Sequence, residues 1–156
     1  MANMIKEMLK KENIQIIHRV ADWKDAIRVS LQPLVAGGYV ELRYIDGVID
    51  STIKYGPYFV LTEDVALIHG RPEQGVIKKQ LAVTLLREAV HFSEDGYPVR
   101  LLVALAASDS ESHIDVMKVL ASIFMEEDKI RAITEAETEE EIYGLFVRAS
   151  EEENKE

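Results

Sequence analysis

The sequence predicts an α/β fold: a single-domain sandwich with a mixed β-sheet flanked by helices on both faces. Two observations favour this class. Apolar stretches typical of strands are interleaved with segments of helical spacing, and helical segments stand at both ends of the chain. The 156 residues fit one domain, which we expect over residues 1–150, with its core at about 10–149 and a frayed acidic tail at 151–156.

The first third of the chain predicts a short helix, a strand and two longer helices. Apolar positions near the N-terminus have helical spacing, and residues 14–20 alternate as in a strand. Asp22 can cap a helix that Gly37-Gly38 ends. Residues 41–54 predict the next helix, which Gly56-Pro57 ends. The buried stripe expected for this helix is Leu42, Ile45, Ile49 and Ile53.

The rest of the chain predicts four strands and two helices. The strands are expected at residues 58–61, 65–68, 80–86 and 99–107. The last of them is almost continuously apolar, which is typical of a strand buried on both faces. Ser108 and Glu111 have the spacing of a capping box before one helix, and Thr138 begins a second box before the last helix. The expected buried stripes are His113, Met117, Leu120, Ala121 and Phe124 in one helix, and Ile142, Leu145, Phe146 and Ala149 in the other.

Composition excludes several classes of function. The chain has no cysteine, so disulfides, thiolate metal sites and cysteine nucleophiles are ruled out. A formal net charge of −10 disfavours nucleic acid or an anionic membrane as partner. Most of this charge is local, because residues 126–156 carry −8 and residues 1–125 carry −2, while residues 65–81 carry +2. Without a targeting segment or an apolar run long enough to span a membrane, we expect a cytoplasmic protein.

Of the four histidines, His69 has the most informative surroundings. It ends a predicted strand and is followed by Gly70-Arg71-Pro72. Glycine lets a ligand approach the backbone, arginine supplies a fork of donors for phosphate, and proline fixes the exit direction. An imidazole in this setting suits a nucleophile that accepts phosphate, although a surface loop histidine has the same short pattern. We expect His18 and His91 to be half-buried structural histidines.

A second candidate is His113, near the start of the helix that follows the long apolar strand. Helix N-termini beside strand ends are common anion sites, and the alternative is a histidine on the core-facing stripe. A metal-dependent hydrolase built on His69, His113 and acidic residues is a weaker hypothesis, because no metal-ligand spacing is present. Neither a glycine-rich phosphate loop nor a serine-hydrolase elbow occurs, so we predict no cofactor and no metal.

Residues 56–61 and 66–76 together resemble the enzyme IIA component of the bacterial phosphoenolpyruvate-dependent sugar phosphotransferase system (PTS). Within it they resemble the mannitol/fructose-type superfamily, and in that superfamily the ascorbate-specific class. The resemblance runs from about Trp23 to Phe146 and includes residues 44–50, 101–107 and 112–116. It implies that His69 is the phosphoacceptor and that His113 is a second active-site histidine.

The resemblance also implies a relay. The phosphocarrier protein HPr donates a phosphoryl group to His69, which passes it to a cysteine of enzyme IIB. The membrane component IIC then moves L-ascorbate or a related polyol or sugar. We expect Arg71, His113 and backbone amides near Gly70 to bind the phosphoryl oxygens. A regulatory phosphoprotein of the same fold, acting on a partner in trans, is the alternative, and the oligomeric state stays open, a homodimer included.

Two residues depart from the family pattern. The residue before the phosphoacceptor histidine is usually proline in the family, and here it is Ile68. In mannitol-type relatives an arginine follows the aspartate of the preceding helix, where this chain has Ser51 after Asp50. We expect Arg71 to supply the missing charge, which favours the ascorbate class over the mannitol class.

Overall fold

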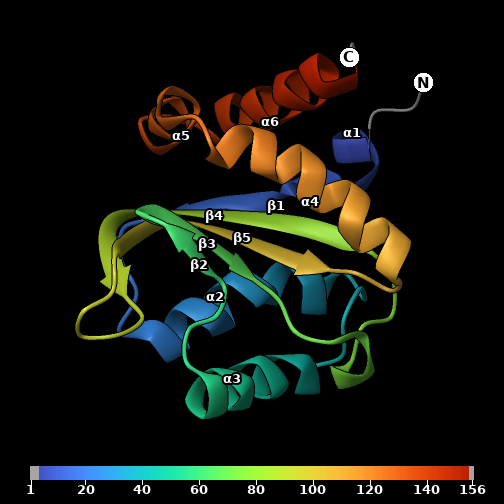
Figure 1. Ribbon diagram of the computed structural model, residues 1–156, viewed down its shortest axis with the longest axis vertical. Coiled ribbons are helices and arrows are strands. Elements are labelled where there is room, and N and C mark those ends of the chain that lie inside the picture. The colour runs from blue at the N-terminus through green and yellow to red at the C-terminus, as the bar shows by residue number, and fades with distance from the viewer. Residues whose placement is uncertain (1–3, 155–156) are drawn as a thin grey trace.

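The computed structural model describes the backbone of residues 4–154 and the side chains of residues 5–109 and 114–151. A five-stranded sheet lies between two layers of helices, as predicted (Figure 1). The strands are β1 (Leu9–Ile17), β2 (Val60–Thr62), β3 (Asp64–Ile68), β4 (Gln80–His91) and β5 (Pro98–Ala106). The helices are α1 (Met4–Met8), α2 (Trp23–Ala36), α3 (Arg43–Tyr55), α4 (Ser110–Phe124), α5 (Glu127–Thr134) and α6 (Glu139–Asn154), with a short 3-10 helix η1 (Pro72–Gln74).

The sheet is mixed, with strand order β1-β4-β5-β3-β2. β1 pairs with β4 and β3 pairs with β5 in parallel, whereas the β4–β5 and β2–β3 pairs are antiparallel. β3 and β5 therefore end at the same edge of the sheet, where β1 and β4 begin. The connections after β3 and β5 leave from this edge, so residues far apart in sequence meet there (Figure 1).

Two hydrophobic cores fill the sandwich, one on each face of the sheet. Helices α1, α4, α5 and α6 cover one face, and α2 and α3 cover the other (Figure 1). Side chains of β5 alternate between the cores: Leu101, Val103 and Leu105 point to the first, and Leu102 and Ala104 to the second. The prediction that this strand is buried on both faces is confirmed.

Two predicted helix caps are confirmed. The Asp22 carboxylate accepts a hydrogen bond of 2.8 Å from the Asp25 amide at the start of α2. The Thr138 hydroxyl accepts one of 3.2 Å from the Glu141 amide at the start of α6, but the Glu141 carboxylate accepts from the Glu137 amide, so the predicted box forms only its cap. The side chain of Glu111, which the third predicted cap needs, lies outside the described residues. Helix α6 continues to Asn154, beyond residue 150, where we expected the folded part to end.

The predicted buried stripe of α3 is correct at two of its four positions. Ile45 is buried and Ile49 is partly buried against the core. Leu42 just before the helix and Ile53 within it are wrong, because they are 67% and 62% exposed. The other buried residues of the helix are Tyr44, Val48 and Thr52. The physical reason is that Tyr44 and Thr52 satisfy their hydroxyls inside the protein, to Leu105 and Val48 respectively, and so can occupy buried positions.

The predictions for His18 and His91 are also wrong, because both side chains are exposed. β1 ends at Ile17, one residue before His18, and His91 ends β4 at the rim of the sheet. Helix α5 is not among the predicted elements. No helix within residues 4–154 is long and apolar enough to cross a membrane.

Candidate active site at the ends of strands β3 and β5

His69 directly follows β3, and strand alternation decides which face of the sheet it occupies. Leu67 points into the core under α4, and Ile68 points into the opposite core, so His69 returns to the α4 side. There it is half-buried at the rim of a hollow of about 330 Å³. The residues that line this hollow are His69, Gly70, Arg71, Pro72, Ala107, Asp109 and Ile114.

A hydrogen bond fixes the tautomer of the His69 ring. The Nδ1 atom lies 2.6 Å from the carbonyl oxygen of Leu67. A carbonyl oxygen only accepts hydrogen bonds, so Nδ1 carries the proton. In the neutral ring the lone pair is then on Nε2. The ring is therefore prepared to act as a nucleophile through Nε2.

Tyr58 contacts both the backbone and the ring of His69. Its hydroxyl donates a hydrogen bond of 2.5 Å to the His69 carbonyl oxygen. The two rings meet edge to face, with centroids 5.5 Å apart and an interplanar angle of 84°. Burial raises the pKa of Tyr58 while the charge of Arg71 opposes this shift, so the hydroxyl remains a donor at neutral pH.

Tyr44, a residue of α3, binds the next backbone group of the turn, the amide of Gly70. Its hydroxyl accepts a hydrogen bond of 2.7 Å from the Gly70 amide and lies 3.2 Å from the carbonyl oxygen of Leu105. The Tyr44 side chain is fully buried, and burial raises its pKa to about 12. One hydroxyl thus ties the turn after β3 to the end of β5 and to α3.

Gln74 holds the third backbone group of the turn. Its Oε1 accepts a hydrogen bond of 2.7 Å from the Arg71 amide. Its Nε2 lies 3.2 Å both from the Gly47 carbonyl oxygen and from the Ser51 hydroxyl on α3. A Cβ atom on Gly70 would lie 2.5 Å from Gln74 Oε1, so a larger residue at position 70 would displace the glutamine.

The two departures from the family pattern have structural roles in this chain. Ile68 is fully buried and pairs with Ala104 in the β3–β5 ladder. Ser51, at the position where the resemblance leads one to expect arginine, contacts Gln74 and so supports the turn from α3.

The amides of Gly70 and Arg71, which we expected to bind the phosphoryl oxygens, have partners within the protein. Both amides already donate to side chains of the protein, to Tyr44 and Gln74. Among the described residues that line the hollow, Arg71 is the one with a permanently positive side chain. Its Nε lies 3.3 Å from Glu73 Oε1, and both side chains are about two-thirds exposed, at 68% and 69%. Such an exposed pair is weak, so Arg71 can exchange Glu73 for an incoming phosphoryl group.

The backbone of His113 belongs to the first turns of α4, but its side chain lies outside the described residues. Its chain neighbour Ile114 lines the hollow beside His69. A role for His113 therefore stays a prediction. Among the described side chains, no three histidine, aspartate or glutamate residues are grouped as a metal ion requires.

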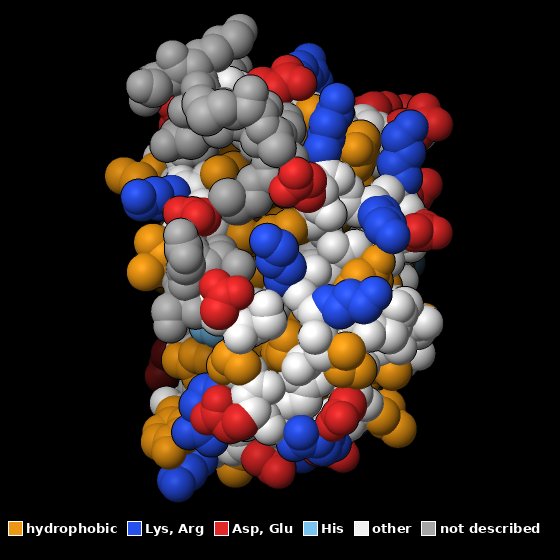
Figure 2. Space-filling model, turned by 90° about the vertical axis from the view of Figure 1, so that its right-hand side faces the viewer, with side chains coloured by type: hydrophobic (Ala, Val, Ile, Leu, Met, Phe, Trp, Pro, Cys, Tyr) orange, Lys and Arg blue, Asp and Glu red, His pale blue; other side chains and the backbone are white. Residues whose placement is uncertain are grey.

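Charged side chains of both signs lie at the same edge of the sheet. Figure 2 faces this edge and shows Lys and Arg side chains interspersed with Asp and Glu side chains. Lys10 and Lys78 both lie over the ring of Tyr39, with Nζ 5.7 and 5.8 Å from its centroid. Lys78 belongs to residues 65–81, which carry a formal charge of +2.

Sequence reasoning singled out His69 and Arg71, which the structure brings to one hollow, but it missed Tyr44, Tyr58 and Gln74. Tyr58 follows Gly56-Pro57, a turn that places it beside β3, and this was the available signal. Tyr44 bonds the Gly70 amide and Gln74 bonds the Gly47 carbonyl, both more than 20 positions away, so no local sequence pattern predicts these contacts.

The fold and the site define an α/β sandwich with His69 and Arg71 at an open hollow where two parallel strands end. The chain belongs to the family described as "Phosphoenolpyruvate-dependent sugar phosphotransferase system, EIIA 2", whose model matches residues 7–148. It is therefore a phosphotransferase, a IIA component that acts with HPr and enzyme IIB.

Curated relatives carry two different substrate names. The "Mannitol-specific cryptic phosphotransferase enzyme IIA component" of Escherichia coli (strain K12) is 33% identical over 144 residues, which cover 92% of this chain and 98% of that protein. The "Ascorbate-specific PTS system EIIA component" of Shigella flexneri is 32% identical over 145 residues, which cover 92% and 94%. The identities are nearly equal, so they do not assign one substrate to this chain.

Solved structures share the fold. The solution structure of the mannitol-specific cryptic enzyme IIA from Escherichia coli superposes with a TM-score of 0.85 at 33% identity, covering 94% of this chain and 99% of that one. The complex of enzyme IIA(Mtl) with phosphorylated enzyme IIB(Mtl) from Escherichia coli gives 0.79 at 30% identity, covering 90% and 97%.

Proposed function

We propose that this chain carries the phosphoryl group of the relay on Nε2 of His69. The observation that supports this assignment is the 2.6 Å hydrogen bond from His69 Nδ1 to the Leu67 carbonyl oxygen. It leaves the lone pair on Nε2, at the rim of a hollow that also contains Arg71.

The first transfer moves a phosphoryl group from the imidazole of HPr to that of His69, and no proton is gained or lost overall. The Nε2 lone pair of His69 attacks the phosphorus of phosphorylated HPr. A new N–P bond forms while the N–P bond of the donor breaks, and its electron pair returns to the donor imidazole. The Leu67 carbonyl keeps the Nδ1 proton in place and stabilises the positive charge that the ring gains.

The second transfer reverses these roles. A cysteine thiolate of enzyme IIB attacks the same phosphorus, an S–P bond forms, and the electron pair of the N–P bond returns to Nε2. Arg71 and His113 are proposed as donors to the phosphoryl oxygens during both steps. Few donors suit a relay, because the group must be held and then released.

L-ascorbate, or a related polyol or sugar, is the substrate we propose for the transport system, with the relay in the cytoplasm and transport through IIC. The resemblance of residues 56–61 and 66–76 to the ascorbate class supports this choice, and a relative named as ascorbate-specific is 32% identical. Transfer from this chain to IIB proteins of different specificity, together with growth on a panel of carbon sources, tests it. Transfer to a mannitol-type IIB and not to an ascorbate-type IIB would contradict it.

Labelling of variants tests the role of His69. We expect His69→Ala to accept no phosphate from 32P-labelled HPr, whereas His91→Ala, a matched change of an exposed histidine, accepts it like the unmodified chain. Label on His69→Ala would show that another residue is the phosphoacceptor.

A further inference from the structure

We propose that Tyr58 is a positioning residue, which holds the His69–Gly70 peptide and the edge of the His69 ring so that Nε2 faces the partner. This inference rests on the proposed function and adds the residue that sets the orientation of the nucleophile. It is carried by contacts that Tyr58 makes with two separate parts of His69.

The first contact completes a clamp on a single peptide unit. The carbonyl of His69 and the amide of Gly70 belong to the same planar group. Tyr58 donates to that carbonyl at 2.5 Å, and Tyr44 accepts from that amide at 2.7 Å. In a trans peptide these two atoms point in opposite directions, so holding both fixes the rotation of the plane. The clamp therefore fixes ψ of His69, just where the β3 ladder has ended.

The second contact concerns the ring itself. Tyr58 meets the imidazole edge to face at 84°, on a centroid distance of 5.5 Å. The bond from Nδ1 to Leu67 is made two residues back along the chain, so it depends on both the backbone angle and the ring rotamer of His69. A ring released from Tyr58 could turn by half a revolution about χ2 and present Nδ1 in place of Nε2.

Tyr58 is well placed to act as a fixed support. Its neighbour Phe59 is fully buried, and the Phe59 carbonyl accepts a hydrogen bond of 2.8 Å from the Leu67 amide of β3. Tyr58 itself is 41% exposed, whereas Tyr44 is fully buried. The hydroxyl of Tyr58 can therefore be removed with less disturbance of the core than that of Tyr44.

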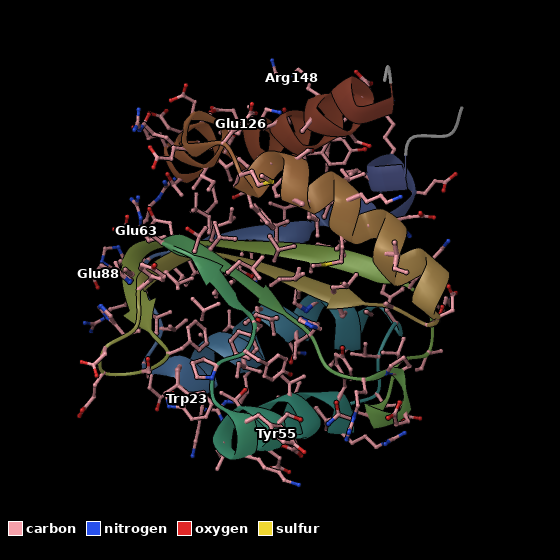
Figure 3. All side chains as sticks on the ribbon, viewed as in Figure 1. Trp23, Tyr55, Glu63, Glu88, Glu126 and Arg148 are labelled. Atoms are coloured by element: carbon pink, nitrogen blue, oxygen red, sulfur yellow. The ribbon has the colours of Figure 1, made fainter. Side chains whose placement is uncertain are left out.

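Two substitutions separate the contacts. Tyr58→Phe keeps the ring and removes the hydrogen bond, and Tyr58→Leu removes both. Tyr55→Phe is the matched control, since Tyr55 is 65% exposed at the end of α3 and points away from the sheet (Figure 3). A thermal unfolding transition, measured for each variant, checks that the variant is folded.

Single-turnover transfer from phosphorylated HPr, at several HPr concentrations, gives the first readout. We expect the saturated rate of Tyr58→Phe to fall about tenfold, and that of Tyr58→Leu further, with the half-saturating HPr concentration unchanged. The control should stay within about twofold of the unmodified chain. A rate lowered only through weaker HPr binding would overturn the proposal and make Tyr58 a docking residue.

Imidazole 15N NMR of the unphosphorylated protein gives the second readout, which a purely structural role would not move. The unmodified chain should show Nδ1 protonated, and Tyr58→Phe should show a mixture of the two tautomers. An unchanged spectrum together with an unchanged rate would overturn the proposal. Because this spectrum needs no phosphoryl transfer, it tests Tyr58 even where the proposed function fails, and that failure would appear as absence of label on the unmodified chain.

Discussion

A hollow lies at each end of the sheet, and the two hollows differ in size and in the side chains that line them. At the end where β3 and β5 begin, α4 and α5 help to enclose a hollow of about 750 Å³, lined by apolar side chains and by several charged ones, Asp64 and Arg100 among them. At the end where the same strands finish, the hollow is about 330 Å³ and holds His69 and Arg71. The larger hollow thus lies away from His69. A relay between proteins needs an accessible nucleophile rather than a deep substrate pocket, so volume is a poor guide to this site.

The two ends also use their polar groups differently. Asp64 has a φ of +71°, a left-handed conformation that is rare for residues other than glycine, and its carboxylate bonds Arg100 at 3.0 and 3.2 Å. Nearby Glu63 lies at this same end in Figure 3. At the other end, neutral groups of Tyr44, Tyr58 and Gln74 hold the backbone. At the end where β3 begins, Asp64 and Arg100 bind each other. At the end where β3 finishes, the side chains of His69 and Arg71 remain accessible at the surface.

The largest effect expected at the phosphoacceptor end, apart from loss of His69 itself, is that of Arg71→Ala. Loss of the guanidinium should lower the rate of phosphoryl transfer about a hundredfold, because it removes a charged donor to the phosphoryl oxygens. Stability should change by no more than about 0.5 kcal/mol, since the Arg71–Glu73 pair is exposed. Rapid-quench transfer assays and urea unfolding measure the two quantities. Arg148→Ala is the control, and an equal loss of rate in both variants would contradict a specific role for Arg71.

Tyr44→Phe is expected to have the next largest effect, this time on stability. It leaves the partly buried Gly70 amide without its acceptor, so the free energy of unfolding at neutral pH should fall by about 1–3 kcal/mol. Urea unfolding measures this change, with Tyr97→Phe, an exposed tyrosine at the β4–β5 turn, as control. No destabilisation relative to Tyr97→Phe would mean that the Tyr44 hydroxyl does not hold the turn.

The same residue predicts a pH dependence. The folded-state pKa of Tyr44, about 12, is above the ordinary value of 10.0, so the folded state binds this proton more tightly than the unfolded state. The corresponding stability is fully present below about pH 10 and is lost as pH rises towards 12, a change of about 2–3 kcal/mol. The difference in unfolding free energy between the unmodified chain and Tyr44→Phe should therefore shrink across this range. A constant difference would contradict the burial of the phenol.

Arg100→Ala should affect stability alone. It removes the partner of the Asp64 carboxylate, which is only 24% exposed, so we expect a loss of about 1–2 kcal/mol. Phosphoryl transfer should be unchanged at a temperature where the variant is folded. A slower transfer by the folded variant would show that the two ends of the sheet are coupled.

The smallest effect is expected from Gln74→Ala. It removes the acceptor of the Arg71 amide and the contact to Ser51, both on a partly solvated turn, so the stability loss should be about 1 kcal/mol. We expect the transfer rate to fall less than in Arg71→Ala, because the guanidinium remains. A rate below that of Arg71→Ala would mean that the backbone conformation of this turn contributes more to phosphoryl transfer than the charge of Arg71 does.

The sequence was sufficient to predict the architecture, and it singled out His69 as the proposed nucleophile. Alternation and continuity of apolar residues predicted the two-sided burial of β5, and the glycine and proline after His69 marked its turn. The α3 stripe was wrong at Leu42 and Ile53 because hydropathy ranks tyrosine and threonine below leucine and isoleucine, although the hydroxyls of Tyr44 and Thr52 find partners inside the protein. The supports of the turn could not be predicted, since each joins residues more than ten positions apart, or acts on a backbone group rather than a side chain.

The position of the N–P bond tests the account most directly. The protein, with 15N in its histidine rings, is phosphorylated by phosphorylated HPr, and the 15N spectrum is recorded for one-bond coupling to 31P. The coupling should appear on Nε2 of His69, with Nδ1 still protonated against the Leu67 carbonyl. Coupling on Nδ1 of His69, or on any other histidine, would contradict the assignment of the nucleophile.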